Sequence, residues 1–230
     1  MVRIKYLAAA IMLAGANIAG AEDGAAILNG QCASCHNVAG PAPGTLQELW
    51  NRKGPDLFYA GLKYKAAWME AWLQNPTRIR PAGMFYADHV KSGAEGGDEI
   101  DDSTLVAHPV LPASEAKAVT AALMERKGNT ELVTTGAYTP GTISRSSGEM
   151  LFDKFKGCLA CHEIEPGYGG LSGPEVYTAG QRLQEDWLAS YLRDPHAWDP
   201  KVFMPDKHIN DADARKFIDY FRLLSEEGVQ

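Results

Sequence analysis

The sequence predicts an all-α protein built from two tandem helical domains. Residues 54–76 align with residues 173–195 without a gap. Seven aligned pairs are identical: Gly54/Gly173, Pro55/Pro174, Ala60/Ala179, Gly61/Gly180, Trp68/Trp187, Leu73/Leu192 and Pro76/Pro195. Apolar residues recur at helical spacing in both copies. Duplication of one helical unit is the simplest account of this repeat, and it argues against one large fold.

Three helices are expected in each unit. In the first unit they cover residues 24–31, 65–74 and 114–127, and in the second 147–156, 184–193 and 211–224. The two middle helices carry the repeated apolar stripe and should end ahead of Pro76 and Pro195, because a residue before proline disfavours helical geometry. Ser114 is a suitable N-cap residue for the third helix, and Gly128 a suitable stop.

These helices divide the chain into a first domain at 22–128, a linker at 129–146 and a second domain at 147–230. A length of 230 residues suits two domains. The first domain contains an acidic insertion at about 86–107, which includes Glu95, Asp98, Glu99, Asp101 and Asp102. A solvated loop is expected there. A docking patch for a basic partner and a calcium site are the alternatives, although the spacing is not that of an EF-hand.

The N-terminus has the pattern of a secretory signal peptide. Arg3 and Lys5 precede an apolar stretch at 6–18, and residues 19–21 offer an A-x-A cleavage site. We therefore expect residues 1–21 to be removed after Ala21 and the mature protein to be periplasmic. An uncleaved N-terminal anchor is the alternative.

The charge of the chain restricts its partners. The net charge is −7, and removal of residues 1–21 would take away Arg3 and Lys5. An acidic surface argues against a nucleic-acid partner. It favours a protein partner with a basic docking surface, because complementary charge speeds encounter.

All four cysteines belong to two Cys-x-x-Cys-His motifs. The first is Cys32, Cys35 and His36, and the second is Cys158, Cys161 and His162. This is the attachment signature of c-type haem: two thiols add to the haem vinyl groups and the histidine binds the iron. Two disulfides, a zinc site or a redox-active dithiol are the alternatives. Disulfides would leave both histidines unexplained, and the two motifs are far apart for one zinc site.

The pattern resembles the class I cytochrome c family in its tandem dihaem form, over nearly all of the mature chain. The resemblance rests on the two motifs, the Gly-Pro pair after each, and a methionine late in each unit. It implies that each domain wraps around one covalently attached haem. It also implies that the carbonyls of Pro55 and Pro174 accept hydrogen bonds from His36 and His162.

The distal iron ligands are expected from the same resemblance. For the second haem the candidate is Met204, shortly before the last helix, with His196 and His208 nearby. For the first haem we expect Met84, which follows Pro76 at nearly the spacing at which Met204 follows Pro195. His108 is an alternative because it precedes its last helix as Met204 does, and His89 is a third candidate.

These features predict an electron carrier rather than an enzyme. The protein would pass single electrons between redox partners, as a soluble carrier or as a subunit of a larger respiratory or dehydrogenase complex. The alternative is a haem enzyme, peroxidase-like or sulfur-compound-oxidising, with a labile distal position at the first haem. Unequal distal ligands would give the two haems different potentials.

Overall fold

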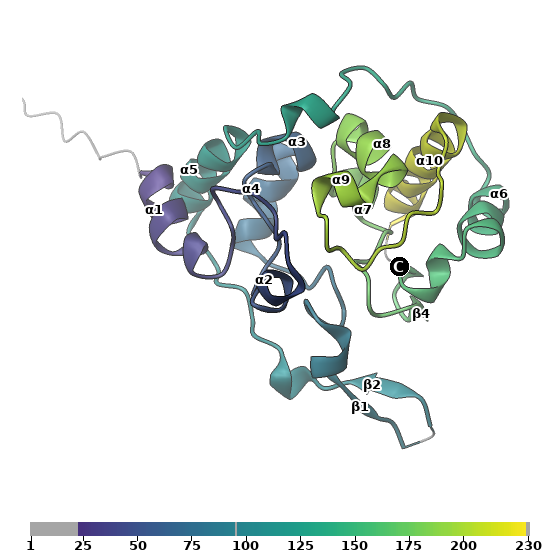
Figure 1. Cartoon of the computed structure of the whole chain (residues 1–230), viewed down its shortest axis with the longest axis horizontal. Helices are drawn as coiled ribbons and strands as arrows, with labels where there is room; N and C mark the ends of the chain where they lie inside the picture. The colour runs from purple at the N-terminus through teal and green to yellow at the C-terminus, as the bar shows by residue number, and fades with distance from the viewer. Residues whose placement is uncertain (1–22, 95, 229–230) are drawn as a thin grey trace, which may run out of the picture.

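The structure is a computed structural model that describes residues 23–94 and 96–228. Helix accounts for 47% of the chain and there is little sheet, so the mostly helical class is confirmed. Two lobes lie next to each other (Figure 1). We call residues 23–128 the first lobe and residues 144–228 the second lobe. The expected signal peptide lies outside the described residues.

The helices of the first lobe are α1 (Gly24–Gly30), α2 (Leu46–Trp50), α3 (Ala60–Lys63), α4 (Ala66–Gln74) and α5 (Ala113–Met124). Those of the second lobe are α6 (Arg145–Glu149), a π-helix (Met150–Phe155), α7 (Ala179–Arg182), α8 (Glu185–Arg193), α9 (Pro195–Trp198) and α10 (Asp211–Glu227). Two short hairpins complete the fold: β1 (Val90–Ser92) with β2 (Asp98–Ile100), and β3 (Glu163–Glu165) with β4 (Tyr168–Gly169). Within the described ranges, no helix combines the length and apolar character needed to span a membrane.

All six predicted helices are present, but some of their ends differ from those predicted. Pro195 follows α8 and also occupies the first turn of α9. A proline there breaks no helical hydrogen bond, because the first N–H groups of a helix have no partner within it. Ser114 is not an N-cap: α5 begins one residue earlier, after Pro112. Gly128 is not the helix stop either, since α5 ends at Met124.

The first and last helices of each lobe cross at a glycine. A Cβ atom on Gly24 of α1 would lie 2.0 Å from the carbonyl oxygen of Ala118 in α5. A Cβ atom on Gly148 of α6 would lie 2.1 Å from the Tyr220 ring in α10. Both distances are too short for any other residue, so the backbone of each first helix can approach the last helix only through glycine. The two lobes therefore share one packing solution.

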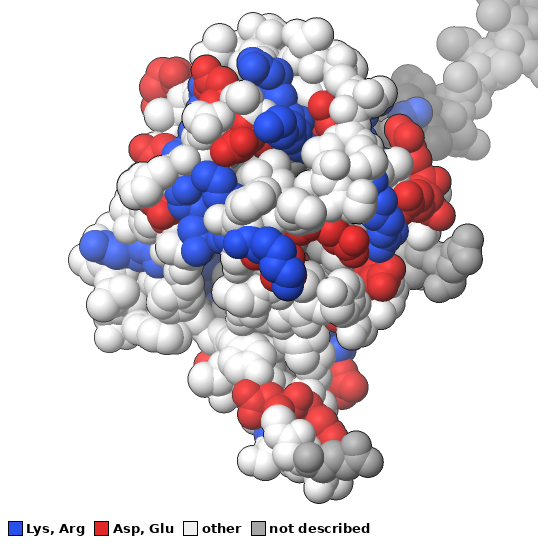
Figure 2. Space-filling model, turned by 90° about the vertical axis from the view of Figure 1, so that its right-hand side faces the viewer, with Lys and Arg blue, Asp and Glu red and all other residues white. Residues whose placement is uncertain are grey.

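The acidic insertion is not a plain loop. It forms the β1–β2 hairpin, which projects away from the first lobe (Figure 1) and pairs Val90 with Ile100. Several of its acids have local partners: Asp98 accepts a hydrogen bond from Tyr86 (2.6 Å), and Asp102 pairs with Arg78. On the face shown in Figure 2, acidic residues gather on this projection, while both signs of charge are mixed over the body above it.

The two lobes meet through equivalent residues of the repeat. Tyr64 and Leu183, which are aligned in the two copies, form an antiparallel β-bridge. The N–H of Lys65 donates to the Arg182 carbonyl, and the N–H of Gln184 donates to the Lys63 carbonyl, each at 2.9 Å. Lys65 is aligned with Gln184, and Lys63 with Arg182. Exchanging the two copies therefore converts one hydrogen bond into the other, so the contact has local pseudo-two-fold symmetry.

A buried ion-pair network also joins the two lobes. Arg52 of the first lobe pairs with Asp56 (2.9 Å) and with Asp199 of the second lobe (2.7 Å). All three side chains are almost fully shielded from solvent. Burial raises the pKa of Asp56, and the charge of Arg52 opposes that rise. Arg52 therefore holds two buried carboxylates from different lobes together.

The predicted linker is held against the second lobe. Its N–H groups at Gly136 and Tyr138 donate to the carboxylate of Asp186, at 2.8 and 3.2 Å. Asp219 accepts from the N–H of Gly141 and from the Tyr138 hydroxyl. These contacts fix the connecting segment at several points along its length.

Replacing Arg52 with alanine is expected to lower the free energy of unfolding by about 3 kcal/mol, because an uncompensated buried charge remains when one partner is removed. Urea unfolding followed by circular dichroism measures the loss. The control is Arg78→Ala, whose ion pair with Asp102 is 46% and 76% exposed, and which should cost less than about 1 kcal/mol. Equal losses in the two variants would contradict the role assigned to Arg52.

Candidate haem-binding sites

The two Cys-x-x-Cys-His motifs fold into the same turn. A 3-10 helix spans Cys32–Ser34 in the first lobe and Cys158–Ala160 in the second. In each turn the histidine N–H donates to the carbonyl of the first cysteine, at 2.9 Å for His36 and 3.1 Å for His162. All four cysteines lie in the described part of the chain and are free thiols, so the structure gives the disulfide alternative no support.

Each motif histidine is tied to the proline expected from the sequence. His36 Nδ1 lies 2.8 Å from the Pro55 carbonyl oxygen, and His162 Nδ1 lies 2.6 Å from that of Pro174. A carbonyl can only accept, so each Nδ1 carries the proton and each Nε2 keeps its lone pair. A second hydrogen bond of this kind is what orients a metal-binding histidine.

The glycine before each proline makes room for the imidazole. A Cβ atom on Gly54 would lie 2.6 Å from Cε1 of His36, and one on Gly173 would lie 2.6 Å from Cε1 of His162. Any side chain at either position would push the ring off its proline carbonyl. The Gly-Pro pair therefore acts as a cradle, in which glycine admits the ring and proline fixes it.

Burial and nearby charges favour the neutral form of the same two imidazoles by lowering their pKa values. Burial lowers the pKa of His36. The hydrogen bond to Pro55 opposes this decrease, and the nearby His108 adds to it. Burial also lowers the pKa of His162, again opposed by its proline, while the charges of Arg80 and Arg182 lower it further. Neutral imidazole is the form that binds a metal.

The thiols do not favour a zinc site. Burial raises the pKa of Cys32, and it raises the pKa of Cys158 to about 11. Zinc needs deprotonated sulfur ligands gathered around one point. Within residues 23–94 and 96–228, no three His, Cys, Asp or Glu side chains are grouped so as to hold a metal ion.

His108 lies across from His36. The centres of the two rings are 6.2 Å apart, and their planes are tilted by 53°. His108 Nδ1 lies 2.8 Å from the carbonyl oxygen of Pro109, so its Nε2 is also left with a lone pair. The ring packs against Trp72 of α4 at 4.6 Å between centres. The structure thus brings one of the sequence candidates close to His36.

The two other candidates for the first site are placed differently. His89 belongs to the base of the hairpin, where its Nδ1 lies 2.9 Å from the Thr104 hydroxyl and its carbonyl accepts from Asp101. Met84 follows Gly83, whose φ is +68°, and lies ahead of the 3-10 helix Tyr86–Asp88 that leads into the hairpin. His89 thus has a local structural role, and His108 is the candidate whose ring contacts that of His36.

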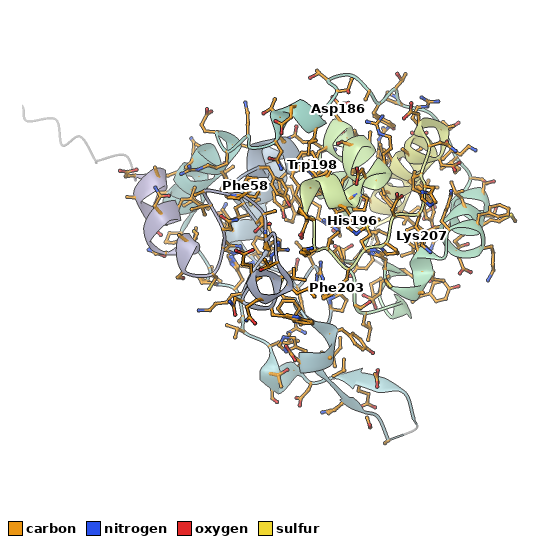
Figure 3. The ribbon with its side chains drawn as sticks, viewed as in Figure 1. Phe58, Asp186, His196, Trp198, Phe203 and Lys207 are labelled. Atoms are coloured by element: carbon orange, nitrogen blue, oxygen red, sulfur yellow. The ribbon has the colours of Figure 1, made fainter. Side chains whose placement is uncertain are left out.

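In the second site, Met204 lies on the loop between α9 and α10. Its side chain is half-buried and packs against the hydrophobic core. The same loop carries Lys207, whose amino group lies 3.8 Å from a Cβ atom built on Gly157, the residue before Cys158. The loop that bears Met204 therefore passes beside the second Cys-x-x-Cys-His turn. Phe203 reaches from this loop toward the first lobe (Figure 3), where its ring lies 5.5 Å from that of Trp50.

Two buried nitrogen donors are associated with the second lobe. The indole Nε1 of Trp187 is buried without a hydrogen-bond partner among the described residues. Arg80 crosses from the first lobe, donates to the Ser172 carbonyl at 3.4 Å, and is buried enough to lower its own pKa. The sequence pattern does not predict the contact between Arg80 and Ser172, because it depends on how the two lobes meet.

Comparison of the chain with protein-family models, with curated proteins and with solved structures finds no match.

Proposed function

We propose that the protein is an exported dihaem c-type cytochrome that transfers single electrons between redox partner proteins. The observation that carries the proposal is the repeated arrangement in the two lobes: the same Cys-x-x-Cys-His turn, with the histidine held in a Gly-Pro cradle. If the two motifs had arisen by chance, the same Gly-Pro contacts to the histidine would not be expected in both lobes.

In each lobe the residues divide the work of holding a haem. Cys32 and Cys35, and likewise Cys158 and Cys161, would form its covalent thioether bonds. His36 and His162 would bind the iron through Nε2, while Pro55 and Pro174 keep Nδ1 protonated. The iron would supply one-electron redox chemistry, and its potential would follow from the axial ligands and the surrounding charges.

Electron transfer is favoured over the enzymatic alternative by the surroundings of His36. An enzyme needs an open or labile coordination position, whereas the His108 ring already faces His36 at 6.2 Å. Partner docking through charge is also part of the proposal, since the chain is acidic overall and its hairpin carries grouped acids on an exposed projection (Figure 2).

The protein is first produced in cells that export it and can attach c-type haem, and is then purified. The reduced pyridine haemochrome spectrum should count two haems per chain, and they should remain attached after unfolding and acid extraction. A potentiometric titration should then require two one-electron steps. Fewer than two covalent haems, or multi-electron turnover of peroxide or thiosulfate at rates typical of an enzyme, would contradict the proposal.

A further inference from the structure

We propose that His108 is the distal iron ligand of the first haem, so that this haem is bound by two histidines while the second is bound by histidine and methionine. This inference deepens the proposed function and rests on it. It departs from the methionine that the sequence pattern alone favours at position 84.

The separation of the two rings is the first argument. With metal–nitrogen bonds of about 2 Å on either side, and about 1 Å from each nitrogen to its own ring centre, two imidazoles on one iron have ring centres about 6 Å apart. The observed separation between His36 and His108 is 6.2 Å. Direct packing of two rings would allow a much shorter contact, such as the 4.6 Å between His108 and Trp72.

The hydrogen bonds are the second argument. His36 Nδ1 is paired with the Pro55 carbonyl, and His108 Nδ1 with the Pro109 carbonyl, both at 2.8 Å. Each bond fixes the proton on Nδ1 and leaves Nε2 as the free donor atom. Both rings are therefore prepared in the tautomer that a metal requires.

The surroundings of His108 are the third argument. Val106 is 96% exposed and Val110 67% exposed, so the segment on either side of His108 carries apolar surface that this chain does not cover. The Trp72 ring meanwhile supports the imidazole from α4. A large apolar ligand is the kind of group that such a segment can help to bury.

Two unequal sites would give the protein a direction. Methionine raises the potential of a haem relative to a second nitrogen ligand, so the first site would lie below the second. A one-electron donor protein would reduce the first site, and that site would be reoxidised as the second gained the electron. A one-electron acceptor protein would then take it, so one electron would move at each stage with no bond formed or broken.

The experiment compares His108→Ala and His108→Met with Met84→Ala and His89→Ala, after haem counting of each protein. The readouts are the weak far-red band that methionine sulfur produces on ferric haem, the spin state, and the two midpoint potentials. We expect His108→Ala to make one haem high-spin and open to added imidazole. His108→Met should double the far-red band and raise the lower midpoint potential, while the two control variants stay unchanged.

The ligand assignment and the proposed function fail in different ways. Loss of half of the far-red band in Met84→Ala, or two low-spin haems in His108→Ala without added ligand, would overturn the assignment of His108 and leave electron transfer standing. A wild-type chain that carries fewer than two covalent haems would instead overturn the proposed function and, with it, this inference.

Discussion

Replacing Cys158 and Cys161 together with serine is expected to leave one covalent haem per chain, held in the first lobe. In our proposal thioether bonds attach each haem, and the sequence has no cysteine outside the two motifs, so no further thiol can replace this pair. Intact mass spectrometry should show a loss of one haem mass. The haemochrome absorbance per chain should fall by half.

The matched control is the double substitution of Cys32 and Cys35, which should remove the other haem and leave the second in place. The far-red band separates the two variants, because only the second site has methionine in our proposal. It should persist when Cys32 and Cys35 are replaced and disappear when Cys158 and Cys161 are replaced. A serine variant that keeps two covalent haems would contradict the attachment sites.

Met204→Ala should lower the potential of the second haem and open its iron to carbon monoxide or added imidazole. In our proposal the methionine sulfur favours the reduced state of this haem, so its removal should favour the oxidised state. If His108 completes the first site, the whole far-red band should be lost, not half of it. Absorption spectroscopy and a potentiometric titration measure both effects.

The control for this change is Met150→Ala, which alters a methionine that is 52% exposed on the π-helix before the second attachment turn. The band and both midpoint potentials should stay as in the wild type. An unchanged second potential in Met204→Ala would show that another residue, such as His196 or His208, completes that site.

The helical framework could be predicted because its signals are local. The apolar stripe and the proline after it placed α4 and α8 to within one residue. The hairpin at 90–100 could not be found this way, because its strands have three residues each and are mostly charged or polar. Their pairing depends on a turn and on contacts such as that between Tyr86 and Asp98. A pattern of neighbouring residues does not predict such contacts.

In the candidate site, too, the local features could be predicted from the sequence and the long-range ones could not. The motif fixes the proximal side, since the cysteines, histidine and Gly-Pro pair follow one another closely in the chain. The distal side of the first site could not be chosen from spacing, because the insertion lies between Met84 and His108. What distinguishes them is the approach of His108 to His36, which depends on how the chain returns from the hairpin to α5.

The backbone exchange between Tyr64 and Leu183 also says something about how such a protein can arise. Equivalent residues meet across a two-fold axis, which is the geometry of an interface between two copies of one subunit. A single-domain ancestor could have made this contact with its own duplicate as a homodimer. Gene fusion would then have turned a concentration-dependent association into an intramolecular one. The two halves were afterwards free to diverge, as the aligned but different residues Lys65 and Gln184 illustrate.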